Sequence, residues 1–337
     1  MHRMKQIRQV IAGKPAEPGE VPFLILSQEF DARYCGLTYE QYVSSVDTIV
    51  ATHVRCVQEF DYDFAWTHLH DLVEFEPLGV PVKGGGNVVP GLAGHLPATA
   101  EMVAGLRIPT LAGMGQMPLL LGGIRGARER FGDDVCVMGR VSAPFSAAIF
   151  LFGMEEGMLM TLTDPELLDK AIAFCESFCT EVARLQVKAG AHALWVGDCN
   201  ATSHLISPAT FRRFALEPAR RLLRAIREMG CIAWYYPGDD APDSLMAFAE
   251  ADPDLLHLTY GTDLPTMRKR LGNRVPLSGN LHPIELLERG SHEAIRAEVR
   301  RLIDAEADKP FILGTADSLT RDTSESNMRA AIEAVRV

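Results

Sequence analysis

The sequence predicts an α/β protein built as a closed (β/α)8 barrel, the TIM-barrel architecture. Three observations predict it: eight short apolar runs recur along 337 residues, helix signals separate most of them, and no linker or internal repeat interrupts the series. Most runs are continuously apolar, which is typical of parallel strands buried on both faces. The predicted strands cover residues 21–26, 62–67, 135–141, 192–197, 231–236, 255–260, 275–279 and 310–315.

Helix start and stop signals fill the gaps between these strands. Asp164 is a capping residue, Pro165 suits the first helical position, and Gly190 ends the helix that they begin. The next helix is predicted to run to residue 230, and the segment before the first strand is predicted to be an N-terminal helical extension. The further helix starts are Ser207, Ser291 and Ser324.

The gap between residues 67 and 135 is too long for a single crossover between neighbouring strands. We therefore predict one domain over residues 1–337 with an insertion on the barrel rim at about 77–131. Gly84, Gly85 and Gly86 lie in this stretch, but no Lys-Ser/Thr follows them and no strand leads directly into a helix. A flexible rim loop therefore explains these glycines better than a phosphate-binding loop does.

Charge and composition exclude several classes of protein. Lys and Arg number 33 against 44 Asp and Glu, so the net charge of −11 disfavours binding to nucleic acid or to anionic lipid. No uncharged apolar stretch is long enough to span a membrane, and the N-terminal residues lack the apolar core of a signal peptide. Seven scattered cysteines do not suggest a disulfide framework, so we predict a cytoplasmic protein.

In a barrel of this kind the active site lies at the carboxyl ends of the strands, and polar side chains follow most of the predicted strands there. Turn formation explains Asp317 and Asn280 equally well, and helix capping explains His282 equally well, whereas His192 and His257 are expected to be structural. The candidate site residues are His68, His70, Asp198, His204, Tyr235, Tyr236, Asp239, Tyr260, Asn280, His282 and Asp317.

Gly279-Asn-Leu-His-Pro283 is followed by two leucines and Gly290. This segment resembles the GN(L/I)DP…LL…G signature of the uroporphyrinogen decarboxylase superfamily. The C-terminal segment 312–327 is similar to the IL…GC…(D)TP.EN pattern of the superfamily. Separately, Asp198 stands where the superfamily has an aspartate that precedes an LLSP..F helix start. Further similar segments are 74–79, 144–145 and 205–211. The match extends over roughly residues 20–335 and implies a TIM barrel.

The resemblance implies two chemistries. Decarboxylases of the superfamily act on uroporphyrinogen without a metal or cofactor, and arginines of an RQAGRY motif hold the substrate carboxylates. The corresponding region here, residues 26–34, retains only Arg33, and Glu29 and Asp31 would repel a polycarboxylate. Because the sequence departs from the decarboxylase motif here, decarboxylation is the less favoured of the two reactions.

The other chemistry is methyl transfer with corrinoid proteins. Thiol-methylating members bind zinc through an HxC motif after strand five and a Cys after strand eight. Here Tyr235-Tyr-Pro237 stands where these members have the HxC motif, and Asp317 (or Ala316) stands where they have the Cys after strand eight. The usual zinc ligands of this chemistry are therefore missing. A rebuilt metal site could use Asp239, His282 and Asp317.

The resemblance therefore predicts a methyltransferase that moves a methyl group between a small methylated substrate, of the ether, amine or thiol type, and a corrinoid. Cleavage of a methyl ether needs acid assistance to the leaving oxygen, which Asp198, Tyr235, Tyr236 and Asp317 could supply. The remaining candidates, His68, His70, His204, Tyr260, Asn280 and His282, are predicted to bind substrate. The chain lacks a DxHxxG-type cobalamin motif, so the corrinoid is expected on a partner protein.

Two other functions stay open at this point. One is a metal-free, decarboxylase-like lyase that acts on a carboxylate substrate through Asp198 and Tyr235. The other is a corrinoid- or tetrapyrrole-binding protein without catalysis, because the usual metal ligands are replaced. A homodimer is also compatible with the sequence. Methylation of cob(I)alamin by a panel of methyl donors, release of CO₂, and tight binding of cobalamin without turnover would distinguish the three functions.

Overall fold

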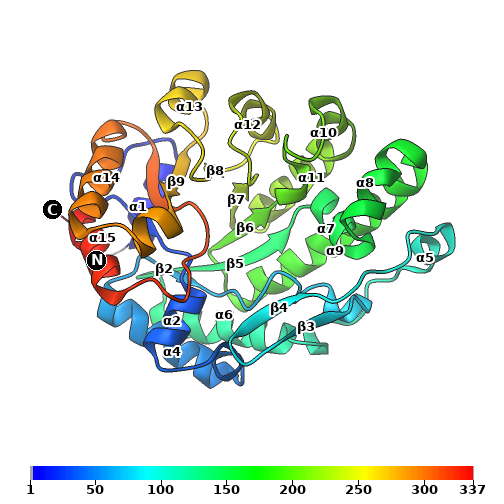
Figure 1. Cartoon of the computed structure of the whole chain (residues 1–337), viewed down its shortest axis with the longest axis horizontal. Helices are drawn as coiled ribbons and strands as arrows, with labels where there is room; N and C mark the ends of the chain where they lie inside the picture. The colour runs from blue at the N-terminus through cyan, green and yellow to red at the C-terminus, as the bar shows by residue number, and fades with distance from the viewer. Residues whose placement is uncertain (1–2, 337) are drawn as a thin grey trace.

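The computed structural model describes residues 3–336 and confirms the predicted eight-stranded parallel barrel, with helices arranged around the sheet (Figure 1). The strand order is β1-β10-β9-β8-β7-β6-β5-β2, and every neighbouring pair in it is parallel. The barrel strands are β1 (Phe23–Leu24), β2 (Phe64–Trp66), β5 (Cys136–Ser142), β6 (Ala193–Gly197), β7 (Ile232–Tyr236), β8 (Leu255–His257), β9 (Leu277–Leu281) and β10 (Phe311–Thr315). Each lies within or overlaps a predicted strand.

Helices precede, connect and follow these strands. Those before β5 are α1 (Arg3–Ile11), α2 (Gln28–Tyr34), α3 (Tyr39–Tyr42), α4 (Val46–Phe60), α5 (Ala100–Gly105) and α6 (Met117–Phe131). Those between β5 and β9 are α7 (Pro144–Phe152), α8 (Met154–Thr163), α9 (Pro165–Ala189), α10 (Pro208–Phe214), α11 (Leu216–Glu228), α12 (Pro242–Ala249) and α13 (Leu264–Leu271). The last two are α14 (His292–Ala305) and α15 (Glu325–Val335). Four single-turn elements are η1 (Glu76–Leu78), η2 (Leu111–Gly113), η3 (Cys199–Ala201) and η4 (Pro283–Glu288).

The predicted capping residues begin and end their helices as expected. The Asp164 side chain accepts a hydrogen bond from the amide of Leu167, and Gly190 ends α9 with a φ of +113°, which glycine adopts without strain. Ser291 and Ser324 cap α14 and α15 in the same way. The helix expected from Ser207 to residue 230 is instead two helices, α10 and α11. Pro218 has no amide hydrogen, so it cannot continue the hydrogen-bond ladder into α10.

The apolar core divides into two parts because side chains of a strand alternate between its faces. One cluster fills the barrel and includes Trp66, Trp195 and Trp234, while the larger cluster packs the outer strand faces against the helices. The N-terminal helix α1 belongs to the inner cluster, because its buried side chains pack with those of the strands. This helix therefore closes the amino-terminal end of the barrel, as the helical extension that the sequence predicts.

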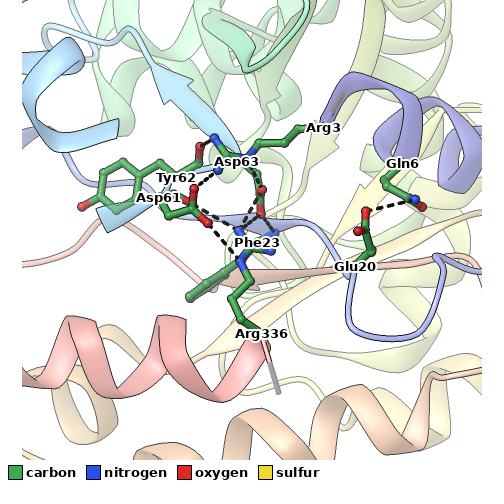
Figure 2. A network of polar contacts seen from close by, with 8 residues as sticks. All are labelled: Arg3, Gln6, Glu20, Phe23, Asp61, Tyr62, Asp63 and Arg336. Carbon is green, nitrogen blue, oxygen red and sulfur yellow. Dashed lines mark hydrogen bonds and ion pairs between the residues drawn. The ribbon is translucent and has the colours of Figure 1, made fainter. Parts of the chain in front are cut away.

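β1 and β2 stand at the two ends of the strand order, and Asp63 connects them (Figure 2). Asp63, directly before β2, is 3% exposed, and its Oδ2 accepts a hydrogen bond from the amide of Phe23 in β1 at 2.8 Å. Arg336 donates to both carboxylate oxygens at 2.9 Å, and Arg3 Nε lies 3.0 Å from Oδ1. Arg3 also pairs with the exposed Asp61. The network thus fastens both chain ends to the open seam of the barrel.

The segment between β2 and β5 contains both a rim insertion and a helix of the outer ring. An antiparallel hairpin of β3 (Val82–Gly85) and β4 (Val88–Leu92) projects from the rim, with α5 beyond it (Figure 1). Gly86 at its turn exchanges hydrogen bonds with Glu40, so the predicted glycine-rich rim loop is a hairpin tip. Helix α6 instead packs against α4, α9 and β5. The insertion predicted over 77–131 therefore includes one helix of the barrel itself.

Over residues 3–336, no single helix is both long enough and apolar enough to cross a membrane. Helices α7 and α8 would satisfy these criteria only if taken together, and the chain bends by 114° between them. Eight of the nine side chains of α7 are buried in the outer core, which accounts for its apolar composition.

Candidate functional site

A cavity of about 380 Å³ opens at the carboxyl ends of the strands, where a barrel of this kind holds its active site. Its walls come from β2, β5, β6, β7 and the segments that follow β1 and β10, and the β3–β4 hairpin contributes Val89 and Pro90. The volume suits one small molecule. The polar and aromatic lining residues are Gln28, Glu29, Trp66, His68, His70, Asp71, Arg140, Phe150, Trp195, Cys199, Tyr236, Asp317 and Ser318.

Aromatic rings form one side of this cavity. The centroids of Trp66 and Trp195 are 5.7 Å apart with their planes at 69°, and those of Trp195 and Tyr236 are 4.6 Å apart with their planes at 38°. Trp66 donates its indole hydrogen to Gln28 Oε1 at 2.9 Å, which fixes the orientation of its ring. The rings therefore meet at angles and form a corner rather than a flat platform.

Arg140 holds together a polar wall that adjoins the aromatic rings, since Arg140 is the register partner of Trp195 on the neighbouring strand. Its Nε lies 3.2 Å from Asp71 Oδ1, its Nη1 donates to the backbone oxygen of Asp71 at 3.1 Å, and Nη1 lies 3.6 Å from Glu74 Oε1. Gln186 of α9 accepts from the amide of Arg140 and donates to its carbonyl, which fixes the strand at this point. The carboxylate of Asp71 opens into the cavity, whereas Glu74 is buried behind it and accepts from the amide of Ser142.

Partial desolvation by the cavity walls works against ionisation of Asp71, but the charge of Arg140 and the nearby ring of His68 outweigh it and hold the pKa of Asp71 well below its usual range. Asp71 is therefore a carboxylate at neutral pH. Burial lowers the pKa of His68 more than Asp71 raises it, so His68 is neutral. The guanidinium of Arg140 is permanently charged, and most of that charge is balanced by Asp71 and Glu74.

Tyr236 and Asp317 meet inside the cavity, as the sequence analysis expected for two of its proton donors. The hydroxyl of Tyr236 donates to Asp317 Oδ2 at 3.3 Å, and the amide of Ser318 donates to Oδ1 at 2.7 Å. Burial raises the pKa of Asp317, and burial together with Asp317 raises that of Tyr236. No Lys or Arg side chain pairs with Asp317 anywhere in residues 3–336.

His68 and His70 also line the cavity, in line with their predicted role in substrate binding. His68 Nε2 lies 3.3 Å from Asp71 Oδ1, so this ring belongs to the arginine wall. His70 Nδ1 accepts from the amide of Leu72. Its Nε2 lies 3.2 Å from a carboxylate oxygen of Glu76 but makes no hydrogen bond with it. His70 is thus a buried donor without a hydrogen-bond partner.

Asp198 and Tyr235 lie outside the cavity lining. The Tyr235 hydroxyl donates to Asp198 Oδ2 at 2.6 Å, and the Ser146 hydroxyl of α7 donates to Oδ1 at 2.7 Å. Both residues are fully buried. Because strand residues alternate, Tyr236 faces the barrel interior and Tyr235 packs with the outer core. The structure therefore separates the four predicted catalytic residues into one pair in the cavity and one pair between barrel and α7.

Asp198 has a pKa of about 6, raised by burial although Tyr235 and Ser146 lower it. A pKa raised in the folded state contributes stability that is complete below the unfolded pKa and is lost as the pH rises through the folded pKa. A rise from 3.8 to about 6 corresponds to about 3 kcal/mol.

The variant Asp198→Asn has no carboxyl group at this position and cannot titrate. We expect the wild type to gain about 2 kcal/mol of unfolding free energy over this variant between pH 8 and pH 4, which is most of the full difference, measured by urea denaturation. A pH-independent difference would contradict the assignment.

The other four predicted substrate-binding residues lie elsewhere. Tyr260, Asn280 and His282 line a separate open hollow of about 460 Å³ beside α13 and α14. Asn280 Nδ2 donates to the carbonyls of Thr259 and Thr262, and His282 caps η4 while its ring stacks on Tyr260 at 4.1 Å. The helix-cap alternative is thus correct for His282, whereas Asn280 lies within β9 and its side chain holds the loop after β8. His204 is exposed and pairs with Asp240.

The structure does not bring the suggested metal ligands Asp239, His282 and Asp317 together. Asp317 lines the cavity and His282 lines the hollow beside α13 and α14. Asp239 already accepts four hydrogen bonds: from the amide and hydroxyl of Ser203, the amide of Ala241 and the hydroxyl of Ser244. The prediction of this ligand triad is therefore wrong, because Asp317 and His282 line different hollows and Asp239 is buried and fully hydrogen-bonded.

In the described chain, one group of three potential metal ligands lies within reach of a single ion: His204, Asp239 and Asp240. A carboxylate offers about four lone-pair sites, and the four hydrogen bonds to Asp239 occupy them. His204 and Asp240 are solvent-exposed and satisfy each other. These residues do not fit a zinc site, so we derive no step that passes through a metal.

Sequence reasoning missed Arg140, Trp66, Trp195 and Gly197 as cavity residues. A charged residue within an otherwise apolar strand was the available signal for Arg140. The tryptophans gave no such signal, because an aromatic residue in a buried strand is equally suited to the outer core. Gly197 ends β6, where the missing side chain leaves room between Arg140 and Trp195.

Comparisons with known proteins agree with the resemblance seen in the sequence. The uroporphyrinogen decarboxylase (URO-D) family model matches residues 3–337. The chain is 30% identical over 224 residues to a methylated-thiol--coenzyme M methyltransferase of Methanosarcina mazei, covering 66% of this chain and 59% of that protein. It is 31% identical over 219 residues to a uroporphyrinogen decarboxylase of Syntrophotalea carbinolica, covering 63% and 62%. The chain therefore spans less than two thirds of the length of these two relatives.

Among solved structures, a methyltransferase from Methanosarcina mazei superposes with a TM-score of 0.90 over 99% of this chain and 98% of that chain. The two are 20% identical, so this is a likeness of fold. The similar curated proteins are enzymes of two kinds, methyltransferases and decarboxylases. With a family model matched across nearly the whole length and the barrel fold confirmed, the chain belongs to the uroporphyrinogen decarboxylase (URO-D) family.

Proposed function

We propose that this protein is a methyltransferase that moves a methyl group from a small donor, bound in the cavity, to a reduced corrinoid carried by a partner protein. The observation that supports it best is the cavity itself. It is small and lined by aromatic rings, and the Tyr236 hydroxyl and the Asp317 carboxylate form a polar pair within it. The similarity to a methyl-transferring enzyme adds support for methyl transfer as the reaction type.

The corrinoid acts as the second substrate in this proposal. A cavity of about 380 Å³ accommodates one small molecule, so a macrocycle with its side chains must approach the mouth from outside. The β3–β4 hairpin reaches the mouth through Val89 and Pro90, and its Val88 is 64% exposed. The hairpin is therefore the segment that an incoming corrinoid protein would meet.

Tyr236 and Asp317 are the groups that we assign to the donor's reacting end. What they must supply depends on the leaving group, since an ether oxygen needs a proton whereas a charged nitrogen or sulfur leaves neutral. Asp198 and Tyr235 are assigned a positioning role. Ser146 Oγ donates to Asp198 and accepts from the amide of Asn200, so these groups hold the loop after β6 against α7.

The charges of the cavity disfavour decarboxylation of a polycarboxylate. Its lining residues include three carboxylates, Glu29, Asp71 and Asp317, and one arginine, Arg140, that is already paired. Uroporphyrinogen carries many carboxylates and would meet net negative charge here. The lyase and the non-catalytic binding protein therefore serve as the alternative outcomes of the experiment below.

The test is anaerobic incubation of the protein with cob(I)alamin and a panel of methyl ethers, methylamines, methylated sulfur compounds and quaternary ammonium compounds. We expect at least one donor to convert cob(I)alamin to methylcobalamin, followed by absorbance. Asp317→Asn should lower the rate at least tenfold, and Asp169→Asn on the surface of α9 should not. Release of CO₂ from uroporphyrinogen without any methylation would support the lyase. Cobalamin binding without either reaction would support the binding protein.

Filling the cavity should block the reaction with little effect on folding. A Cβ at Gly197 would lie 3.6 Å from Arg140 Nη2 and 3.8 Å from Trp195 Nε1, which are ordinary contacts. Gly197→Ala should therefore retain activity. Gly197→Val extends further into the cavity and should weaken donor binding at least tenfold, while a β-branched residue in a strand costs less than about 1 kcal/mol. Kinetics and thermal melts check both; equal activity of the two variants would place the donor elsewhere.

A further inference from the structure

We propose that the donor bound in this cavity is a small onium cation, a quaternary ammonium or sulfonium compound, held in the corner of Trp66, Trp195 and Tyr236 and facing the Asp317 carboxylate. This inference rests on the proposed methyltransferase function and deepens it by naming the substrate class. It is carried by the angles between the rings, by the balance of charge around the cavity, and by the chemistry of the leaving group.

The angles between the rings favour a rounded cation over a flat ligand. The ring planes of Trp66 and Trp195 stand at 69° to each other, and those of Trp195 and Tyr236 stand at 38°. Rings that meet at such angles can contact a tetrahedral methylated centre on more than one side. The face of each ring also attracts positive charge. An aryl ether carries no charge for these ring faces to attract.

The balance of charge points in the same direction. Arg140 is paired with Asp71 and Glu74, so its charge is already balanced. Burial raises the pKa of Glu29, although the charge of Arg321 works in the opposite direction and so offsets that carboxylate in part. Asp317 has no pairing Lys or Arg in residues 3–336, and it adjoins the aromatic corner through Tyr236. A bound cation would supply the counter-charge that Asp317 lacks.

The leaving group of an onium donor removes the need for an acid. When the methyl group is transferred, the bond between carbon and nitrogen or sulfur breaks and both its electrons remain on the heteroatom, which leaves as a neutral amine or sulfide. The reduced corrinoid supplies the electron pair of the new bond to the methyl carbon, and no proton is transferred. Burial and Asp317 raise the pKa of Tyr236, which makes it a poor proton donor for an ether oxygen.

A pair of isosteric ligands tests the inference without any corrinoid. Choline and 3,3-dimethyl-1-butanol have the same shape, but only choline is charged. By isothermal titration calorimetry we expect choline to bind at least tenfold more tightly than the neutral isostere. Asp317→Asn and Trp195→Leu should abolish this preference, while Trp195→Phe, which keeps an aromatic face, and Asp169→Asn on the surface should retain it. Equal binding of the two ligands, or tighter binding of the isostere or of methoxybenzene, would overturn the inference.

The binding test and the methyl-transfer test can fail separately. If choline is preferred but no onium donor methylates cob(I)alamin, the site recognises onium cations and the proposed function is wrong. If aryl ethers methylate cob(I)alamin and onium compounds do not, the function stands and the substrate class is wrong. Circular dichroism of each variant shows whether a loss of binding follows from a loss of folding, and Asp317→Asn, which keeps size and shape, remains informative if Trp195→Leu unfolds.

Discussion

Replacing Arg140 with Met should destabilise the protein by leaving two carboxylates without their partner. The guanidinium balances Asp71 and the buried Glu74, and Met would fill much of its volume without charge. Removing one partner of a buried ion pair costs about 3–5 kcal/mol, because a carboxylate is left without compensation. We expect a loss near the lower end, about 3 kcal/mol, because Asp71 opens into the cavity and Glu74 can take up a proton. Urea denaturation measures the loss.

The pH dependence of this loss separates the charge effect from a packing effect. Burial already raises the pKa of Glu74 although Arg140 lowers it, and without Arg140 the pKa should rise further. A raised pKa in the folded state favours folding at low pH, so the deficit of Arg140→Met should shrink as the pH falls from 8 to 5. Arg184→Met, which removes an exposed ion pair with Glu181, should leave stability unchanged at both pH values. A deficit that is constant with pH would contradict the charge account.

Replacing Asp63 with Ala should give the largest loss of stability at the amino-terminal end of the barrel. The variant leaves Arg3 and Arg336 without their shared partner and the amide of Phe23 without its acceptor. These losses should lower the free energy of unfolding by about 3–5 kcal/mol. Methyl transfer at permissive temperature should be unaffected, because Asp63 precedes β2 at the opposite end from the cavity.

Two further variants assign the effect to the seam between β1 and β2. Asp63→Asn keeps an oxygen that can accept from the amide of Phe23, so it should be less destabilising than Asp63→Ala. Asp61→Ala removes the exposed partner of Arg3 and should change the unfolding free energy by less than about 1 kcal/mol. If Asp63→Ala unfolds at the same urea concentration as the wild type, Asp63 does not close the barrel.

The fold could be predicted because its signals are local and repeated. Each strand is a short apolar run and most helices carry a cap, so that Asp164 and Gly190 mark one helix before any tertiary contact is known. The split at Pro218 and the place of α6 in the outer ring were missed for a different reason. They depend on packing between helices, which a linear pattern does not encode.

The candidate site could be predicted only as far as the strand ends. Tyr235 and Tyr236 are adjacent in a strand that is apolar on both faces, so the sequence cannot tell which of them faces the interior. In the structure Tyr236 lies on the inward face of β7 and bonds Asp317, whereas Tyr235 lies on the outward face and bonds Asp198. Arg140 lies in the strand interior and joins the site because the cavity extends below the rim, where a search of strand ends does not reach.

The central claim is that a methyl group leaves a donor bound in this cavity and reaches a corrinoid. Its most direct test is the transfer of a deuterated methyl group from trideuteromethyl-labelled donors, choline among them, to cob(I)alamin, with mass spectrometry of the cobalamin product. We expect labelled methylcobalamin with the wild type and with Gly197→Ala, and at least tenfold less with Gly197→Val and Asp317→Asn. Cobalamin that stays unlabelled with every donor, or labelling that Gly197→Val does not reduce, would contradict the claim.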